Sequence, residues 1–212
     1  MSGVRNFRSN NICFITPLGG NEGIVLEALE SGIRWIQYRE KNRSKREIFY
    51  QAVKLREITR RFDACFVVND YVDIAIAVDA DGIHIGQDDL HIAETRRIMG
   101  YTKIVGVSTH TLREAMEAEK GGADYIGFGP VFYTATKDAG EPKGVDVLRK
   151  IKDSVKIPVI AIGGIKTDNV KSVFDAGCDG AAVSSGILEG NTRENVRIFC
   201  LAGKTGRLEK RN

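Results

Sequence analysis

The stretch Asp79–Gly86 reads DADGIHIG, and its pattern decides the fold. A small residue and an aspartate precede a short run that is apolar on both faces, as the strands of a covered parallel sheet are. The same order recurs in Gly122–Gly129, GADYIGFG, and in Gly177–Ser184, GCDGAAVS. The recurrence suggests that one βα unit is used repeatedly along the chain.

Outside these segments, short apolar runs alternate with amphipathic stretches. The spacing of apolar residues predicts helices over Lys45–Phe62, Leu112–Lys120 and Val145–Ser154. Asp168 is expected to cap a further helix, which Gly177 ends. The predicted strands are Ile12–Thr16, Ile33–Arg39, Cys65–Asn69, Gly82–Gly86, Ile104–Thr109, Tyr125–Val131, Pro158–Gly163 and Gly180–Ser184.

Eight strands that alternate with helices, without a linker between domains, predict a single (β/α)8 TIM barrel over residues 12–202. Residues 1–11 are expected to form a flexible N-terminal segment, and residues 203–212 a basic C-terminal tail. An open, doubly wound sheet is the alternative. Its GxGxxG turn after the first strand is absent, because TPLGGNEG spaces its glycines differently.

Composition and charge argue against several classes of protein. Hydrophobic residues make up 42% of the 212 residues and charged residues 28%, which is typical of a soluble globular protein. No apolar run approaches the roughly 20 residues that span a bilayer, so we expect no membrane partner. The net charge is only +3 and its basic residues are dispersed, so we expect no nucleic-acid partner.

The compartment is predicted from the N-terminus and the cysteines. The N-terminal residues lack the apolar core of a signal peptide, which favours a cytoplasmic protein. The four cysteines form no CxxC pair, so a disulfide framework or a zinc site is not expected. These cysteines are Cys13, Cys65, Cys178 and Cys200.

Polar residues and glycines follow nearly every predicted strand. Barrel enzymes carry their chemistry at these carboxyl ends and in the loops that follow them. In chain order the strand ends hold Gln37–Lys41, Asn69–Asp70, Gly86–Asp89, Ser108–His110, then Thr134, Thr136 and Lys137, then Gly163–Gly164 and Ser184–Ser185. The sequence therefore predicts an active site built from many strands.

Asp70 and Asp89 follow consecutive strands, so their carboxylates could share a hard cation. Mg²⁺ prefers one or two carboxylates together with water and substrate phosphates. The alternative is that Asp70 caps a helix that starts near Tyr71, and that Asp88 or Asp89 caps the next helix. The pair, beside cationic strand ends, favours Mg²⁺.

Arg39 and Lys41 are the cationic candidates at the second strand end. Arg39 offers a bidentate fork to a phosphate and Lys41 offers a point charge. The alternative is a surface ion pair with Glu40 or Glu47.

Glycine-rich ends after strands seven and eight favour a second anion site near Gly164, Ser184 and Ser185, since glycine lets backbone N–H groups approach a phosphate. Among the histidines, His84 is expected to line the barrel and His91 to start a helix, whereas His110 could act as a general acid or base. Two anion sites are a layout for joining two phosphorylated molecules.

Five motifs in this order resemble the thiamine-phosphate synthase family. They are QYREK, VVNDYVDIAIAVDADGIHIGQDDL, GVSTH, GADYIGFGPVFYTATK and VIAIGGI. The resemblance implies a transferase of thiamine biosynthesis that joins 4-amino-2-methyl-5-(diphosphooxymethyl)pyrimidine to a 4-methyl-5-(2-phosphoethyl)thiazole, carboxylated or not. A pyrimidine carbocation forms first, and thiamine phosphate and diphosphate are the products.

The resemblance also implies roles for individual residues. Mg²⁺ would be held by Asp70 and Asp89. The pyrimidine diphosphate would be bound by Gln37, Tyr38, Arg39, Glu40, Lys41, Asn69, His84, Ser108 and Lys137. Among these, the catalytic residues would be Arg39, Lys41, Ser108 and Lys137. The thiazole phosphate would be bound by Thr134, Ala135, Thr136, Gly164, Ser184 and Ser185.

Three positions depart from the family pattern: Cys13, Pro17 and Ser184 replace the residues that members usually carry. A related thiazole tautomerase on the same barrel is one alternative, with His110 as its acid or base. A non-catalytic barrel that binds thiamine metabolites is another. Whether the chain is a monomer or a homo-oligomer stays open.

Overall fold

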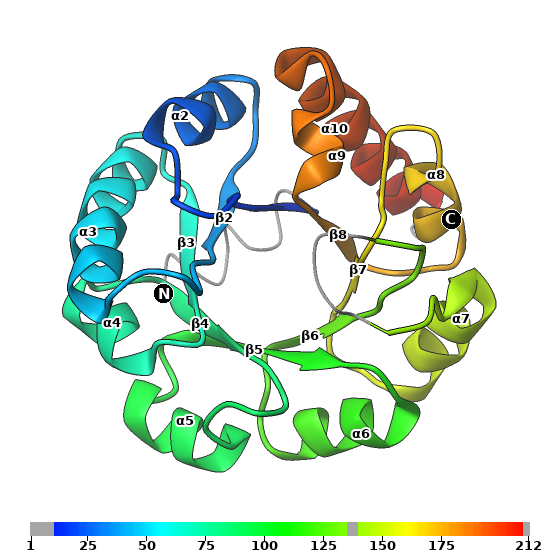
Figure 1. Cartoon of the computed structure of the whole chain (residues 1–212). Coiled ribbons are helices and arrows are strands. Elements are labelled where there is room, and N and C mark those ends of the chain that lie inside the picture. The colour runs from blue at the N-terminus through cyan, green and yellow to red at the C-terminus, as the bar shows by residue number, and fades with distance from the viewer. Residues whose placement is uncertain (1–10, 135–139, 210–212) are drawn as a thin grey trace.

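The computed structural model describes residues 11–134 and 140–209, and it forms a closed barrel with all neighbouring strands parallel. Figure 1 shows the strands as an inner ring that helices surround. The strands are β1 (Ile12–Ile15), β2 (Trp35–Tyr38), β3 (Cys65–Asn69), β4 (Gly82–Ile85), β5 (Ile104–Thr109), β6 (Tyr125–Phe128), β7 (Val159–Ile162) and β8 (Gly180–Val183). The prediction of a single (β/α)8 barrel is confirmed.

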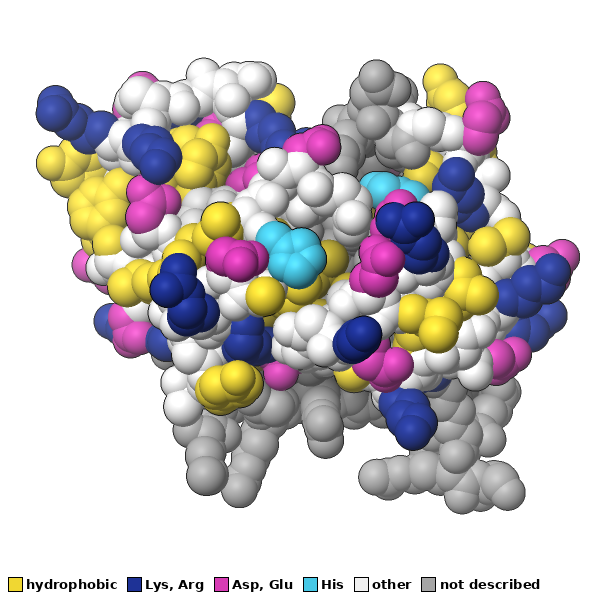
Figure 2. Space-filling model, turned by 90° about the horizontal axis from the view of Figure 1, so that it is seen from below, with side chains coloured by type: hydrophobic (Ala, Val, Ile, Leu, Met, Phe, Trp, Pro, Cys, Tyr) yellow, Lys and Arg dark blue, Asp and Glu magenta, His cyan; other side chains and the backbone are white. Residues whose placement is uncertain are grey.

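The helices alternate with the strands along the chain. They are α2 (Glu22–Glu30), α3 (Lys45–Arg61), α4 (Val72–Ala77), α5 (Ile92–Met99), α6 (Leu112–Lys120), α7 (Gly144–Ser154), α8 (Val170–Asp175), α9 (Ser185–Leu188) and α10 (Thr192–Glu209). Within the described part of the chain, no helix combines the length and the apolar character needed to cross a membrane. On the face seen in Figure 2, which carries α5 and α6, acidic and basic side chains are interspersed with hydrophobic ones.

All eight predicted strands are present, and six of them are shorter than predicted. The residues lost from their carboxyl ends belong instead to the βα loops, where the polar candidates lie, and β2 and β7 also begin later than predicted. The predicted cap at Asp168 is wrong. Helix α8 begins at Val170 after Asn169. Asn169 fastens the preceding turn, because its side chain accepts from Lys166 N at 2.8 Å and donates to Gly164 O at 3.0 Å.

The C-terminal segment continues as a helix through residues predicted to be a tail. Helix α10 runs to Glu209, and Gly203 within it is buried. The side-chain amide of Asn11 donates to Gly203 O at 3.4 Å, and α10 packs on α8, as Figure 1 shows. The packing of α10 on the barrel therefore orders part of the predicted tail. Residues 1–10 lie outside the described part of the chain.

Alternation along the strands divides the apolar residues into two clusters. The inner cluster fills the barrel and comprises Cys13, Ile15, Trp35, Cys65, Val67, Ile104, Tyr125, Ile160 and Ala182. The outer and larger cluster joins the strands to the helices. In β2, Trp35 belongs to the inner cluster and Tyr38 to the outer one. Gln37 has the same orientation as Trp35 and therefore faces the interior.

The recurring aspartate of the opening motif forms one bond pattern three times. Each carboxylate accepts from a backbone N–H of the preceding strand and pairs with a basic side chain of the helix before that strand. Asp81 accepts from Phe66 N (2.8 Å) and pairs with Arg56 (2.8 Å). Asp124 accepts from Val105 N (2.8 Å) and pairs with Arg96 (2.7 Å). Asp179 accepts from Val159 N (2.9 Å) and pairs with Lys152 (2.6 Å). The motif thus joins a helix to a strand at the amino-terminal ends of β4, β6 and β8. The carboxyl ends of the strands do not take part in these contacts and remain available for a functional site.

Candidate active site

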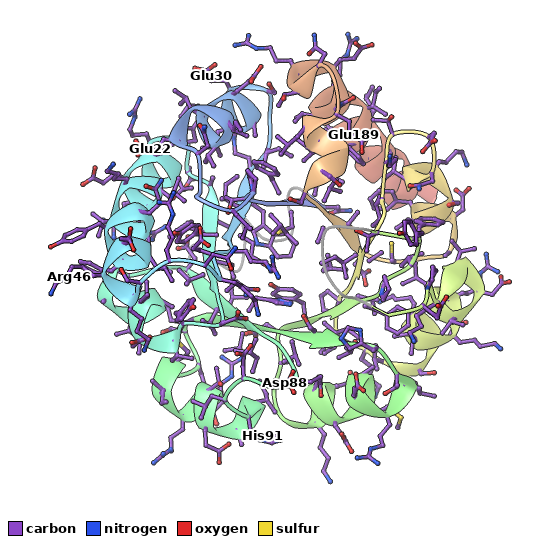
Figure 3. The ribbon with its side chains drawn as sticks, viewed as in Figure 1. Glu22, Glu30, Arg46, Asp88, His91 and Glu189 are labelled. Atoms are coloured by element: carbon purple, nitrogen blue, oxygen red, sulfur yellow. The ribbon has the colours of Figure 1, made fainter. Side chains whose placement is uncertain are left out.

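A pocket lies at the carboxyl ends of the strands, where the sequence predicts the site. Its lining comes from the ends of β1, β2 and β5 to β8. It includes Thr16, Arg39, Ser108, His110, Thr134, Gly163, Gly164, Ser184 and Ser185. Charged residues elsewhere, such as Glu22, Glu30 and Arg46 in Figure 3, extend outward from the surrounding helices.

Arg39 and Lys41 are not held in the surface ion pairs considered above. The Arg39 side chain lines the pocket and pairs with no carboxylate among the described residues. Lys41 Nζ lies 3.1 Å from Asp70 Oδ2. Glu47 is occupied elsewhere, in a capping box with Ser44 at the start of α3. Arg39 therefore faces the pocket, whereas Lys41 lies at the carboxylate of Asp70.

Glu40 lies between these two cations in sequence, but its side chain has turned into the protein and is 2% exposed. Its carboxylate accepts from the backbone N–H groups of Gly19 (2.6 Å), Lys41 (2.8 Å) and Asn42 (2.8 Å). Burial raises the pKa of Glu40, but these donors and Arg43 outweigh burial and hold the pKa below its ordinary value. Glu40 fixes the loop instead of facing the pocket.

Asp70 and Asp89 come together as predicted. Burial raises the pKa of Asp70, and the adjacent Asp89 carboxyl raises it further, against the effect of Lys41. Asp89 Oδ2 also accepts from Gly86 N at 2.7 Å. Two crowded carboxylates form an arrangement that a divalent cation would relieve.

The capping roles considered for these aspartates are not observed. Helix α4 begins after Tyr71 without a side-chain cap, and Asp70 adopts a left-handed φ of 66°. His91 is the cap of α5, as predicted for a histidine at a helix start: its ring accepts from Ala93 N at 3.3 Å. Asp88 and His91 lie in the loop between β4 and α5 (Figure 3). No group of three or more His, Cys, Asp or Glu residues in the described ranges is arranged as a metal cage.

Polar side chains lie in the centre of the barrel. His84 is 5% exposed, and its two ring nitrogens contact the Tyr125 hydroxyl (2.9 Å) and Ser108 Oγ (2.8 Å). Asn69 pairs in register with His84 across β3 and β4, and Gln37 is also buried. From the barrel interior, these groups can form hydrogen bonds with a flat, polar ring bound at the carboxyl ends of the strands.

The second predicted anion site is formed by the loops after β7 and β8. Gly163 and Gly164 adopt φ values of 95° and 63°. A Cβ on Gly164 would lie 2.3 Å from Tyr133 O, so only glycine fits this close approach. Helix α9 begins beside it at Ser185, and its first backbone N–H groups have no acceptor within the helix. Thr134 lines the same pocket.

Some predicted site residues lie elsewhere. Tyr38 is in the outer cluster, 1% exposed, so the structure brings neither its ring nor the Glu40 carboxylate to the pocket. The physical reason is alternation, which directs Arg39 inward and its neighbours outward. The predicted residues Ala135, Thr136 and Lys137 lie outside the described part of the chain.

The sequence reasoning missed the contribution of Tyr125. Its hydroxyl contacts His84, and its ring packs edge-on against Trp35 with centroids 5.1 Å apart. Glycines within strands were the available signal, because a glycine there often marks a close approach. Gly106 leaves the space that the Tyr125 ring occupies.

Comparison with known proteins gives one consistent result. The sequence profile of the thiamine monophosphate synthase family matches residues 12–187. The chain is 48% identical to the thiamine-phosphate synthase of Chloroflexus aurantiacus over 79% of this chain and 78% of that protein. It is 46% identical to the Halalkalibacterium halodurans thiamine-phosphate synthase over 84% of each chain. The solved thiamine phosphate pyrophosphorylase of Pyrococcus furiosus superposes with a TM-score of 0.86 at 41% identity, covering 96% of this chain and 98% of that one.

Proposed function

The chain belongs to the thiamine monophosphate synthase family, and we propose that it is a Mg²⁺-dependent transferase that makes thiamine phosphate in the cytoplasm. The substrates are 4-amino-2-methyl-5-(diphosphooxymethyl)pyrimidine and the phosphorylated thiazole. The bond between the pyrimidine methylene carbon and the diphosphate oxygen breaks, and its electron pair leaves with diphosphate. The thiazole ring nitrogen then donates its lone pair to the carbocation and forms the new C–N bond.

The polar residues at the carboxyl ends of the strands divide between the two substrates. Arg39, Lys41 and Ser108 bind the diphosphate, where negative charge develops as the C–O bond breaks. The second phosphate lies at Gly164 and the start of α9. The buried polar groups of Gln37, Asn69 and His84 hold the pyrimidine, and the site aligns the two reacting atoms.

Asp70 and Asp89 would hold the Mg²⁺. Burial and the adjacent Asp89 carboxyl raise the pKa of Asp70, which supports this assignment, because a divalent cation at the pair would stabilise both carboxylates in their ionised form. When bound, Mg²⁺ would neutralise charge on the diphosphate. This chemistry requires no protein nucleophile.

One observation carries the proposal: Arg39 is a cation that pairs with no described carboxylate and shares a pocket with the glycine-rich phosphate loop. A barrel that bound a single phosphate would need only one of these two features. The free state of all four cysteines agrees with a reducing compartment, which supports the cytoplasmic assignment.

The test measures diphosphate release by purified protein. We expect release only when both substrates and Mg²⁺ are present. Arg39→Met is expected to lower turnover about 100-fold, while Arg46→Met, on the outer surface of α3, is the matched control. Asp89→Asn tests the proposed Mg²⁺ ligand, and Asp88→Asn, at the adjacent exposed position, is its matched control.

Two other outcomes would contradict the proposal. Interconversion of thiazole isomers without diphosphate release would identify the tautomerase, with His110 as its acid or base. Binding of both substrates without turnover would identify a non-catalytic barrel. Equal loss of activity in Arg39→Met and Arg46→Met would remove the role given to Arg39.

A further inference from the structure

A row of hydrogen-bonded polar side chains crosses the barrel interior and ends at the pocket. The Gln37 side chain bonds the Tyr125 hydroxyl. That hydroxyl lies 2.9 Å from His84 Nδ1, and His84 Nε2 lies 2.8 Å from Ser108 Oγ. Gln37, Tyr125 and His84 are 4%, 1% and 5% exposed, whereas Ser108 reaches the pocket. The first three groups are therefore shielded from bulk water.

The surrounding strands hold this row in place. A Cβ on Gly106 would lie 2.1 Å from Tyr125 Cζ, and a Cβ on Gly127 would lie 3.2 Å from His84 Cε1. Trp35 packs edge-on against the other side of the Tyr125 ring, with an interplanar angle of 87°. Gly106, Gly127 and Trp35 thus fix the positions of the Tyr125 and His84 rings, so packing of the core holds the row in place.

The row has two internally consistent directions when His84 is neutral. In the first, the Gln37 amide donates to Tyr125, Tyr125 donates to Nδ1, and Nε2–H donates to Ser108 Oγ. The Ser108 hydroxyl proton is then left to donate into the pocket. In the second direction every bond is reversed, and Ser108 donates its proton to His84. Ser108 could then offer the pocket only an acceptor.

We infer that the row runs from Gln37 towards Ser108, and that Tyr125 is a positioning residue which keeps Ser108 a hydrogen-bond donor to the leaving diphosphate. This inference rests on the proposed function. An anion beside Arg39 needs donors, and an acceptor oxygen there would repel it.

The direction of the row affects the chemical step more than substrate binding. The charge on the diphosphate oxygen grows as the C–O bond breaks, so a donor fixed in advance stabilises the transition state more than the ground state. Loss of the fixed direction should therefore lower kcat with little change in KM.

The first experiment determines the tautomer of His84 by ¹⁵N NMR of the imidazole nitrogens, with His84→Gln to assign the signal. We expect the proton on Nε2 in the wild-type protein and a mixture of tautomers in Tyr125→Phe. A proton on Nδ1, or on both nitrogens, in the wild-type protein would overturn the inference. The wild-type tautomer is measured without substrate and without turnover.

The second experiment is a double-mutant cycle on turnover. Tyr125→Phe and Ser108→Ala are each expected to lower kcat by about 10- to 100-fold, and the double variant should be no slower than Ser108→Ala, because Tyr125 acts through Ser108. Tyr50→Phe, exposed on α3, is the control. Additive losses, or an unchanged kcat in Tyr125→Phe, would overturn the inference. Absence of turnover in the wild-type protein would instead contradict the proposed function and leave the tautomer result standing.

Discussion

Replacing Glu40 by glutamine tests how the loop after β2 is held in place. The Glu40 carboxylate accepts three backbone N–H bonds while 2% exposed, and it ties Gly19 in the preceding loop to Lys41 and Asn42 in its own. In Glu40→Gln one carboxylate oxygen becomes an NH₂ group, which faces an N–H donor. The change preserves size and shape, so its effect reports on the bonds themselves.

The magnitude follows from the number and kind of bonds. A hydrogen bond to a charged group contributes about 1.5–3 kcal/mol, and a neutral one about 0.5–1.5 kcal/mol. If the amide keeps its oxygen towards Lys41 and Asn42, those two bonds weaken and the bond from Gly19 is lost. We expect the free energy of unfolding to fall by about 3 kcal/mol, which is roughly 6–12 °C in Tm for a chain of this length.

The assay is thermal unfolding followed by circular dichroism from neutral to acid pH. The pKa of Glu40 is held below its ordinary value. Its contribution is therefore fully present above the unfolded pKa of about 4.3 and is lost as the pH falls through the lower folded value. The difference between wild type and Glu40→Gln should shrink at acid pH, and KM for the pyrimidine diphosphate should rise at neutral pH because Arg39 and Lys41 lose their fixed positions.

The control is Glu57→Gln, at an exposed position on α3, which should change Tm by no more than a degree or two, since surface changes contribute about 0.5 kcal/mol. A Glu40→Gln protein as stable as Glu57→Gln would refute the reasoning, and so would a difference that persists unchanged below pH 3.

Three further predictions concern other parts of the barrel. Asp70→Asn should raise Tm at neutral pH in EDTA, because the raised pKa of Asp70 means that its ionised form destabilises the fold. Addition of Mg²⁺ without calcium should no longer raise the Tm of this variant, and a Mg²⁺ response equal to that of the wild type would contradict the metal assignment. Asp81→Ala should lower the free energy of unfolding by about 3 kcal/mol in denaturant titrations, since it leaves a nearly buried arginine unpaired, whereas exposed Asp168→Ala should not. Gly164→Ala should raise KM for the thiazole phosphate about 10-fold or more through the lost close approach; an unchanged KM would move that phosphate elsewhere.

The sequence by itself determined the barrel and the strand ends. Period and run length specify strands locally, and the repeated aspartate before β4, β6 and β8 marks one unit used again. Because parallel strands share one carboxyl edge, the cations and carboxylates at their ends were predicted to meet, and Lys41, Asp70 and Asp89 do. These features depend on local pattern and on topology.

Only the tertiary structure decided which way the side chains of a polar run face and what they contact. QYREK gives no sign that the Glu40 carboxylate is taken by backbone N–H groups while Arg39 lines the pocket. The contact of Tyr125 with His84 joins β6 to β4, and it exists because Gly106, on the strand between them, leaves the space. Such contacts depend on the closure of the barrel. Closure brings residues that are distant in sequence within hydrogen-bonding distance, and it fixes the distances between their donor and acceptor atoms.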